Sequence, residues 1–404
     1  MEQKRILHLG LGAFHRAHQA VYQQALLDAG EQAWALWSGN LRADPTGAEA
    51  ALIAQDGAYT LETISAAGVH RYQRVNAIAR VIPHEPGLRA LVEAAADPAT
   101  RIISCTVTEG GYGLGTPDLT AETIYAFLSR ALRQRMSQAA GPVTLLCCDN
   151  LRHNGQVLRN GLLQFVSLLG DAPLHDWIEQ RCSFPCTMVD RITPRPNEAV
   201  RDRVLLALGH FDKAALMAED WLQWVIEDRF AAGRPPWESV GVQMVVSAGE
   251  VTAFEEAKIR ILNASHSAMA WAGALRGHRF IHECARDPAI RKIAHDYVTD
   301  DVIPLLSGPI NLPAYRDAVL ARFGNEALGD TVERVLADSA AKVREFILPT
   351  LRERLQRGES IASTAMLPAL YLRWSGSEIE SLEELASDQR ICLAVNQASA
   401  HLLC

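Results

Sequence analysis

Hydrophobic residues in the first 150 positions form short continuous runs that alternate with stretches of helical spacing. Apolar residues in the run 16–30 recur every three or four positions, which predicts a helix that ends at Gly30. Continuous apolar runs are typical of a parallel sheet covered on both faces. The predicted strands are residues 5–12 and 34–40, together with 101–111 and 143–150, which are the two with a nearly continuous apolar run.

The pattern changes along the chain. Residues 59–75 alternate around Gly68 and predict a β-hairpin. Residues 155–170 and 220–230 have helical spacing, residues 241–247 resemble a last strand, and from about residue 250 the spacing is helical to the end. We therefore expect an α/β fold: a Rossmann-type domain with a mostly parallel sheet over 1–247, and an all-helical domain over 248–404.

Composition restricts the possible partners. The 404 residues have a net charge of -8, which argues against non-specific binding to nucleic acid or to an anionic membrane. No apolar run reaches the roughly 18 residues of a membrane helix. The eight cysteines are scattered and suggest free thiols in a reducing cytoplasm. Cys182 and Cys186 lack a second ligand pair, so no metal site is predicted. A monomer or a small homo-oligomer fits equally well.

A glycine turn follows the first predicted strand. Gly10 and Gly12 would let the backbone approach a pyrophosphate, although His15 stands where a third glycine usually lies. Asp44, past the second strand, could hold the ribose hydroxyls of NAD, whereas Arg42 could pair with a ribose phosphate. A plain strand–turn–helix connection remains an alternative. Thr108, Glu109 and Gly110 follow the third strand at the same expected sheet edge.

Residues 255–271 carry the candidate chemistry. At about 100° per residue, Glu255, Asn263 and His266 fall within about 140° of Lys258 on one helix face, while Arg260 points away. A buried lysine can have its pKa lowered into the working range, which an arginine cannot. Lys258 is therefore a candidate general base for an alcohol. A lysine that extends along a helix surface is the alternative interpretation.

Two further polar residues follow predicted strands. Asn150 could donate a hydrogen bond to a developing alkoxide together with Asn263, or it could simply form a turn. Asp190 could bind sugar hydroxyls or pair with Arg191. The chain has no Tyr-x-x-x-Lys pair, so a metal-free lysine mechanism is the remaining dehydrogenase chemistry.

These motifs resemble the polyol-specific long-chain dehydrogenases, the mannitol 2-dehydrogenase family. The resemblance extends over most of the chain, and its branch that oxidises D-arabinitol is the most similar. The matching segments are GLGAFHRAHQA, TVTEGGY, CDNLRHNG, FPCTMVDRITP, AKIRILNASHS and ERVLADSAAK.

The resemblance implies a role for each matching residue. The first segment would be the NAD-binding turn, including Phe14 and His15, and the missing third glycine is usual for this family. Lys258 would be the general base, Asn150 and Asn263 would stabilise the alkoxide, His266 would orient the alcohol, and Glu255 would help protons reach solvent. Asp190, Arg334 and Lys342 would contact the polyol.

Some features depart from the family. The segments after Gly113 and after Trp374 are shorter than in relatives, and Pro45 stands where the family has an acid, with Asp44 one position away. The expected reaction is D-arabinitol to D-xylulose, with D-mannitol or another hexitol as the alternative substrate. A sugar-acid reductase would need an additional cation near the substrate, and an NAD-binding sensor without turnover would be expected to lack the base or an amide.

Overall fold

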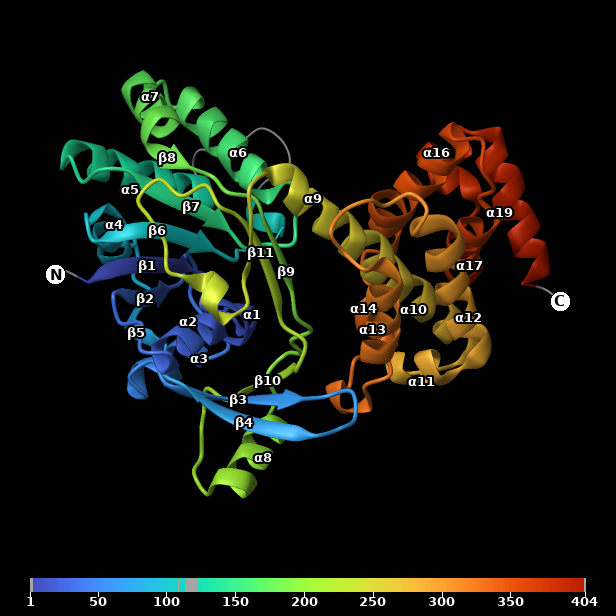
Figure 1. Cartoon of the computed structure of the whole chain (residues 1–404), viewed down its shortest axis with the longest axis horizontal. Coiled ribbons are helices and arrows are strands. Elements are labelled where there is room, and N and C mark those ends of the chain that lie inside the picture. The colour runs from blue at the N-terminus through green and yellow to red at the C-terminus, as the bar shows by residue number, and fades with distance from the viewer. Residues whose placement is uncertain (1–2, 108, 113–122, 403–404) are drawn as a thin grey trace. The chain divides into compact units, whose positions relative to one another are not determined.

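The computed structural model describes residues 3–107, 109–112 and 123–402 and contains two compact units (Figure 1). The N-terminal unit comprises Met1–Thr63 and His70–Thr252, and the C-terminal unit comprises Ile64–Val69 and Ala253–Cys404. The predicted Thr108 and the segment after Gly113 lie outside the described residues.

A six-stranded sheet organises the N-terminal unit. Its strand order is β5-β2-β1-β6-β7-β8, and every neighbouring pair is parallel, as the apolar runs predicted. The strands are β1 (Lys4–Leu9), β2 (Trp34–Gly39), β5 (Ile78–Ile82), β6 (Thr100–Cys105), β7 (Val143–Cys147) and β8 (Cys182–Ser183).

Successive side chains of these strands enter two separate apolar clusters. On β7, Leu145 and Cys147 pack in one cluster, and Leu146 packs in the other. Helices therefore cover both faces of the sheet (Figure 1), which explains why its strands are apolar throughout. The helices of the first cluster are α4 (Arg89–Ala96), α5 (Ile124–Ser137), α6 (Asn154–Leu168) and α7 (Ala172–Arg181); those of the second are α2 (Gln19–Asp28) and α3 (Ala48–Ala54).

Two three-stranded sheets complete this unit, in the orders β10-β3-β4 and β12-β11-β9. The predicted hairpin around Gly68 is confirmed, and Asn325 of the C-terminal unit donates to the backbone oxygen of Ile64 at its tip. The remaining elements are β3 (Tyr59–Ile64), β4 (His70–Val75), β9 (Thr187–Asp190), β10 (Leu216–Glu219), β11 (Gln223–Glu227), β12 (Gln243–Val245), α1 (Ala13–Ala17), α8 (Glu198–Leu208), η1 (Glu109–Tyr112) and η2 (Trp237–Val240).

Two predicted helices of this unit are corrected. The predicted helix over 220–230 is wrong, because Trp224, Val225 and Ile226 are all buried in strand β11, between β9 and β12. β-branched and aromatic residues favour a strand that is covered on both sides. The continuous helix over 16–30 is also wrong: His18 has φ -123° and ψ -89°, which separates α1 from α2.

The C-terminal unit is helical, as predicted. It starts within α9 (Ala248–Ala257), which leads into η3 (Lys258–Asn263) and α10 (Ala264–Arg276). The other elements are α11 (Ile281–Arg286), α12 (Pro288–Asp296), η4 (Tyr297–Val302), α13 (Leu312–Phe323), η5 (Glu326–Leu328), α14 (Val332–Leu336), α15 (Ser339–Lys342), η6 (Val343–Ile347), α16 (Leu348–Gln356), α17 (Ala362–Ser375), η7 (Ile379–Ser381), α18 (Glu383–Ala386) and α19 (Gln389–His401).

Three segments of this unit, η3, η4 and η6, are π-helical, and η3 packs against the other two. Backbone bonds that span five residues define them, for example from the Ala264 N–H to the Ile259 oxygen. The π-helix is rare and is frequently found at functional sites. Among the described residues, no helix has both the length and the apolar composition to cross a membrane.

Candidate functional site

The two glycines of the first turn have different structural requirements. Gly10 has φ +108°, and a Cβ there would lie 2.1 Å from the backbone oxygen of Thr106 at the end of β6. Gly12 has an ordinary φ, and a Cβ there would meet nothing within 4 Å. Gly10 is therefore required by the fold itself, whereas Gly12 leaves open space beside the backbone where a ligand can approach.

A buried imidazole occupies the place of the third glycine. His15 stacks on His8 with 3.6 Å between ring centroids and an interplanar angle of 6°, and its Nε2 lies 3.0 Å from the Ser38 Oγ. Burial lowers the pKa of His8 to about 3 and that of His15 well below its usual value, so both rings are neutral. The pair fills the space beneath the turn. Phe14, which is predicted to contact the cofactor, is half-buried and stacks on His18 with centroids 4.9 Å apart.

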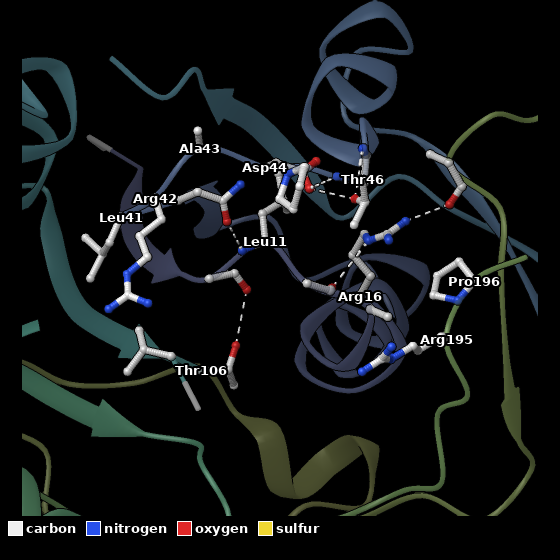
Figure 2. A pocket seen from close by; sticks show the side chains of 18 of the residues that line it. Leu11, Arg16, Leu41, Arg42, Ala43, Asp44, Thr46, Thr106, Arg195 and Pro196 are labelled. Carbon is white, nitrogen blue, oxygen red and sulfur yellow. Dashed lines mark hydrogen bonds between the residues drawn. The ribbon is translucent and has the colours of Figure 1, made fainter. Parts of the chain in front are cut away.

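A cavity of about 600 Å³ opens at the carboxyl ends of β1, β2 and β6 (Figure 2). Its lining includes the predicted Gly10, Gly12, Arg42 and Asp44. In an open parallel sheet, ligands bind at this edge, where the strand order reverses. Four further lining cations, Arg16, Arg195, Arg201 and Lys213, were not predicted, because Arg16 and the stretch 195–213 are far apart in sequence and line one cavity only in the folded chain.

The segment that follows β6 is held by the carboxylate of Asp149. Asp149 accepts hydrogen bonds from the hydroxyl of Tyr112, at 2.5 Å, and from the backbone N–H of Val107, at 2.9 Å. Burial, followed by nearby thiol and carboxylate charge, raises the pKa of Tyr112 well above its usual value, so its hydroxyl remains a donor. These bonds fix both ends of the segment that contains Glu109 and Gly110, which lie in η1.

Asn150 directly follows Asp149 and is exposed on the turn after β7. The buried side chain of Asn154 fixes this turn: its Nδ2 donates to the backbone oxygens of Cys147 and Asp149, and its Oδ1 accepts from the Thr187 N–H. Such a buried amide is not distinguishable from a helix cap in the sequence. Its contacts appear only when the strands are in place.

Asp190 lies buried at the end of β9, in the N-terminal unit. The neighbouring Arg191 donates to the backbone oxygens of Ala17, at 2.6 Å, and Glu219, at 2.8 Å. Arg191 therefore links α1 to the end of β10.

Lys258 is the first residue of the π-helical segment η3. Both Lys258 and Glu255 are buried, while Asn263 and His266 are half-buried. The uniform α-helix assumed for this segment is wrong. In a π-turn the backbone bond joins residues five apart, which places Lys258 and Asn263 closer in azimuth than 100° per residue allows. The π-turn therefore improves the alignment that the sequence only suggested.

Ion pairs of Arg260 fix the position of the π-helical segment η3. Arg260 is buried and donates to Glu256 and to Glu353 of α16, both at 2.7 Å. The bond to Glu353 attaches η3 to α16, and Arg260, which makes it, lies two residues after Lys258. A buried arginine with two carboxylates in such geometry forms strong, directional hydrogen bonds.

Asp330, which the sequence analysis did not single out, connects two of the predicted residues. Its carboxylate lies 2.9 Å from His266 Nε2 and accepts from Arg334 Nε at 2.7 Å. Burial raises the pKa of Asp330, but the bonds with His266 and Arg334 outweigh it and lower the pKa overall. An ionised carboxylate can only accept, so Nε2 of His266 carries a proton and Nδ1 of a neutral ring is left as an acceptor. Phe323 stacks on the same ring at 4.8 Å.

The third residue predicted to bind the polyol, Lys342, ends α15. Its Nζ donates to the backbone oxygen of Val335 in α14 at 2.5 Å. The C-terminal unit therefore brings His266 and Arg334 together through Asp330, and Lys342 lies on a neighbouring helix connection.

One group of described residues has the composition of a metal site: Cys105, Cys147 and Asp149, all buried. Their atoms already interact, because the Tyr112 hydroxyl contacts Asp149 and both thiols. Burial also raises the pKa of the Cys147 thiol, which disfavours the thiolate that a metal requires. All seven described cysteines are free thiols.

A parallel sheet, a glycine turn and a cavity at the carboxyl ends of its central strands together define a dinucleotide-binding domain of the Rossmann type. Residues 4–239 match the family model described as mannitol dehydrogenase Rossmann domain, and residues 250–401 match that of the mannitol dehydrogenase C-terminal domain. The chain belongs to the mannitol dehydrogenase family.

Individual relatives agree with this assignment. The chain is 50% identical to a D-arabinitol 4-dehydrogenase of Ralstonia nicotianae, over 91% of this chain and 82% of the relative. It is 47% identical to a D-arabinitol 4-dehydrogenase of Klebsiella pneumoniae, over 90% and 83%. The structure of Pseudomonas fluorescens mannitol 2-dehydrogenase in ternary complex with NAD and D-mannitol has a TM-score of 0.88 at 32% identity, covering 99% of this chain and 92% of that chain.

Proposed function

We propose that the protein is a polyol dehydrogenase that oxidises D-arabinitol to D-xylulose with NAD. The main support is the similarity to two proteins named D-arabinitol 4-dehydrogenase, at 50% and 47% identity over nine-tenths of the chain. The observation within the structure that carries the chemistry is Lys258: a buried lysine on a π-turn, with Asn263 five residues further on.

The proposed chemistry uses Lys258 as the base. Its neutral amine takes the proton from the secondary hydroxyl while the carbinol carbon loses its hydride. When bound, the nicotinamide ring supplies the hydride acceptor. The side-chain amides of Asn150 and Asn263 donate hydrogen bonds to the alkoxide oxygen as its charge develops. Glu255, buried one helical turn before Lys258, passes the proton on toward solvent.

Binding of the polyol is assigned to polar groups that suit uncharged hydroxyls. His266, held by Asp330, is assigned to orient and bind the reacting alcohol group. Asp190, Arg334 and Lys342 hold the rest of the polyol chain. Hydroxyls both donate and accept, so carboxylates and cations can serve together in such a site.

The cofactor is assigned to the N-terminal unit. The open space at Gly12 suits a pyrophosphate, and the cavity continues past the end of β2 to Arg42 and Asp44. Thr108, Glu109 and Gly110 are proposed to contact the cofactor from the third strand end. His15 acts beneath the turn rather than within the cavity, because it packs on His8.

A hexitol such as D-mannitol is the second candidate substrate. It is favoured by the similarity to the mannitol 2-dehydrogenase whose structure contains D-mannitol. D-arabinitol is preferred because the two relatives with that name share more of the sequence with this chain.

The test is NADH formation by the purified full chain, with a chelator present and at pH values from neutral to alkaline. The substrates are D-arabinitol, D-mannitol, D-sorbitol, xylitol and D-altronate. We expect the highest kcat/KM with D-arabinitol, and a rate that rises with pH as one group loses a proton. A higher kcat/KM with a hexitol would mean that the hexitol, and not D-arabinitol, is the preferred substrate. Activity with D-altronate alone would overturn the polyol assignment. NADH binding without turnover of any substrate would favour a sensor.

A further inference from the structure

A histidine is buried in a central strand of the parallel sheet, where its neighbours along the chain are apolar. His8 lies in β1 between Leu7 and Leu9, and all three side chains are fully buried. A polar side chain at such a position lowers stability unless its polar atoms are hydrogen-bonded. Both ring nitrogens of His8 have a partner: Nδ1 lies 2.8 Å from the Ser104 Oγ, and Nε2 lies 2.9 Å from the Thr106 Oγ1. An apolar residue would serve the sheet equally well, which indicates that this ring has a further role.

Contacts on its face and at both nitrogens fix the orientation of the His8 ring. His15 of α1 stacks on it and is itself held by Ser38 of β2. Ser104 lies opposite His8 in the register of β1 and β6, and its hydroxyl also contacts Gln19 Oε1 of α2 at 3.0 Å. Burial lowers the pKa of His8 to about 3, so the ring is neutral and has a single N–H. Because a hydroxyl can donate or accept, both bonds of the ring form in either tautomer.

Thr106 connects this buried ring to the dinucleotide cavity. It directly follows β6 and lines the cavity at the carboxyl ends of the central strands (Figure 2). Its Oγ1 also lies 3.2 Å from the backbone oxygen of Gly10 in the glycine turn. A hydroxyl has one hydrogen and two lone pairs, so beyond the His8 ring and the Gly10 oxygen it retains capacity for one further partner. Thr106 is half-buried, and this capacity is open to a ligand in the cavity.

We infer that His8 is a positioning residue for the dinucleotide: through Nε2 it fixes the rotation of the Thr106 hydroxyl, which forms a hydrogen bond with an oxygen of the bound cofactor. This inference rests on the proposed function, because it concerns the cofactor of the same reaction. Without the ring, the Thr106 hydroxyl can rotate to the Gly10 oxygen alone, and the cofactor then has to reorient it on binding. The alternative is a purely structural role, in which His8 only fills the space beneath the turn.

Two substitutions of His8 preserve different halves of its hydrogen bonding. The asparagine amide lies where Nδ1 was and can keep the bond to Ser104, whereas the longer glutamine places its amide near Nε2 and can keep the bond to Thr106. Both remove the ring that stacks on His15, so both should lower the urea midpoint of the full chain by similar amounts.

Fluorescence titration with NADH distinguishes the two variants. We expect His8→Asn to weaken NADH binding about tenfold, as for one hydrogen bond, and His8→Gln to stay within about threefold of wild type. Equal losses of affinity in the two variants would mean that the ring acts only through packing, and would overturn the inference.

A double-mutant cycle tests Thr106 directly. Thr106→Val removes the hydroxyl, keeps the shape of the side chain and should weaken NADH binding about tenfold. Added to His8→Asn it should cause no further loss, because the two residues act through one hydrogen bond to the cofactor. Losses that add to about a hundredfold in the double variant would overturn the inference.

Thr100→Val is the matched control for this cycle. Thr100 is buried at the start of the same strand, donates to the backbone oxygen of Ala94 at 2.7 Å, and is not among the described residues that line the cavity. The substitution should lower stability and leave NADH affinity unchanged. A tenfold loss of affinity here would show that the cavity responds to any buried hydroxyl of β6, which would also overturn the inference.

The same titrations separate this inference from the proposed function. If the wild-type protein neither binds NADH nor turns over a polyol, the proposed function fails. If the wild type binds NADH and Thr106→Val binds it equally well, the function stands and the inference is wrong. Should His8→Asn not fold, His8→Gln with and without Thr106→Val replaces the cycle. The double variant should then bind NADH about tenfold more weakly than His8→Gln, and equal affinities would overturn the inference.

Discussion

The dinucleotide cavity and the π-helical segment η3 (Lys258–Asn263) are built in different ways. At the cavity, backbone conformation is decisive: Gly10 has a positive φ and a Cβ there would clash with the Thr106 oxygen, while neutral His8 and His15 fill the space beneath. At Lys258 the side chains are decisive, positioned by a π-turn. The glycine turn is a short run of consecutive residues that packs against the end of β6, whereas the arrangement around Lys258 depends on contacts among separate helices.

The two regions should therefore respond differently to substitution: one mainly through protein stability and the other mainly through catalytic activity. A change in the glycine turn alters the fold of the sheet edge and hence cofactor binding. A substitution that changes only the polar end of a side chain near Lys258 should lower catalytic activity while the helices remain packed.

The substitution Lys258→Met should lower kcat by about 10³-fold, within the range for loss of a general base. Thermal stability should change little, because methionine keeps the buried aliphatic chain. Steady-state kinetics with D-arabinitol and NADH fluorescence titration are the measurements. Lys292→Met, at an exposed lysine of α12, is the matched control and should retain activity. Full activity in the Lys258 variant would refute the lysine mechanism.

The substitution Gly10→Ala should destabilise the protein by about 3 kcal/mol or more, because it combines a positive φ with a steric clash against the backbone. Urea unfolding of the full chain measures the effect. The paired variant Gly12→Ala should stay within about 1 kcal/mol of wild type. It should still weaken NADH binding, since the methyl group would fill the open space. If the two variants were equally stable, the division of roles between the glycines would be wrong.

The substitution Asp330→Asn should lower kcat/KM about tenfold, because the charge-assisted bond that orients His266 is lost. NADH affinity should be unchanged, since the cofactor cavity is in the other unit. Asp287→Asn is the control: Asp287 also lies beside a histidine, His278, at 3.5 Å. Equal losses of kcat/KM in the two variants would mean that Asp330 acts only through stability.

Acidification should destabilise the protein through the buried imidazoles. His8 has a pKa of about 3 in the folded protein against 6.5 in the unfolded chain, so the unfolded state binds more protons between these values. Its contribution to stability is complete above pH 6.5 and is lost as the pH falls toward 3, by at most about 1.4 kcal/mol per pH unit.

Urea unfolding at pH 7.5, 6 and 5 measures this slope. In His8→Gln the free energy of unfolding should be lower at pH 7.5 and should fall less steeply with acidification. Identical slopes in the two proteins would show that the ring does not remain neutral in the folded state.

Several features of this protein were determined by the sequence alone. The apolar runs predicted the parallel sheet, because strands buried on both faces tolerate few polar residues, and the glycine turn after β1 marked the edge of the cavity. The family resemblance in motifs such as AKIRILNASHS predicted the family that the comparisons show. Each of these signals is local, so it can be read from consecutive residues.

Other features were decided only by the tertiary structure. Residues 220–230 have helical spacing but contain strand β11 (Gln223–Glu227), because β9 and β12 supply backbone partners and the buried Trp224 packs on Tyr22 and Trp237. The π-turn at Lys258 could not be predicted from a 3.6-residue period, since packing against η4 and η6 accompanies it. The contacts of Asp330 with His266, and of Asp44 with its own loop, likewise depend on where folded backbone places polar atoms. The sequence shows which polar side chains are present, whereas long-range packing decides which of them contact one another.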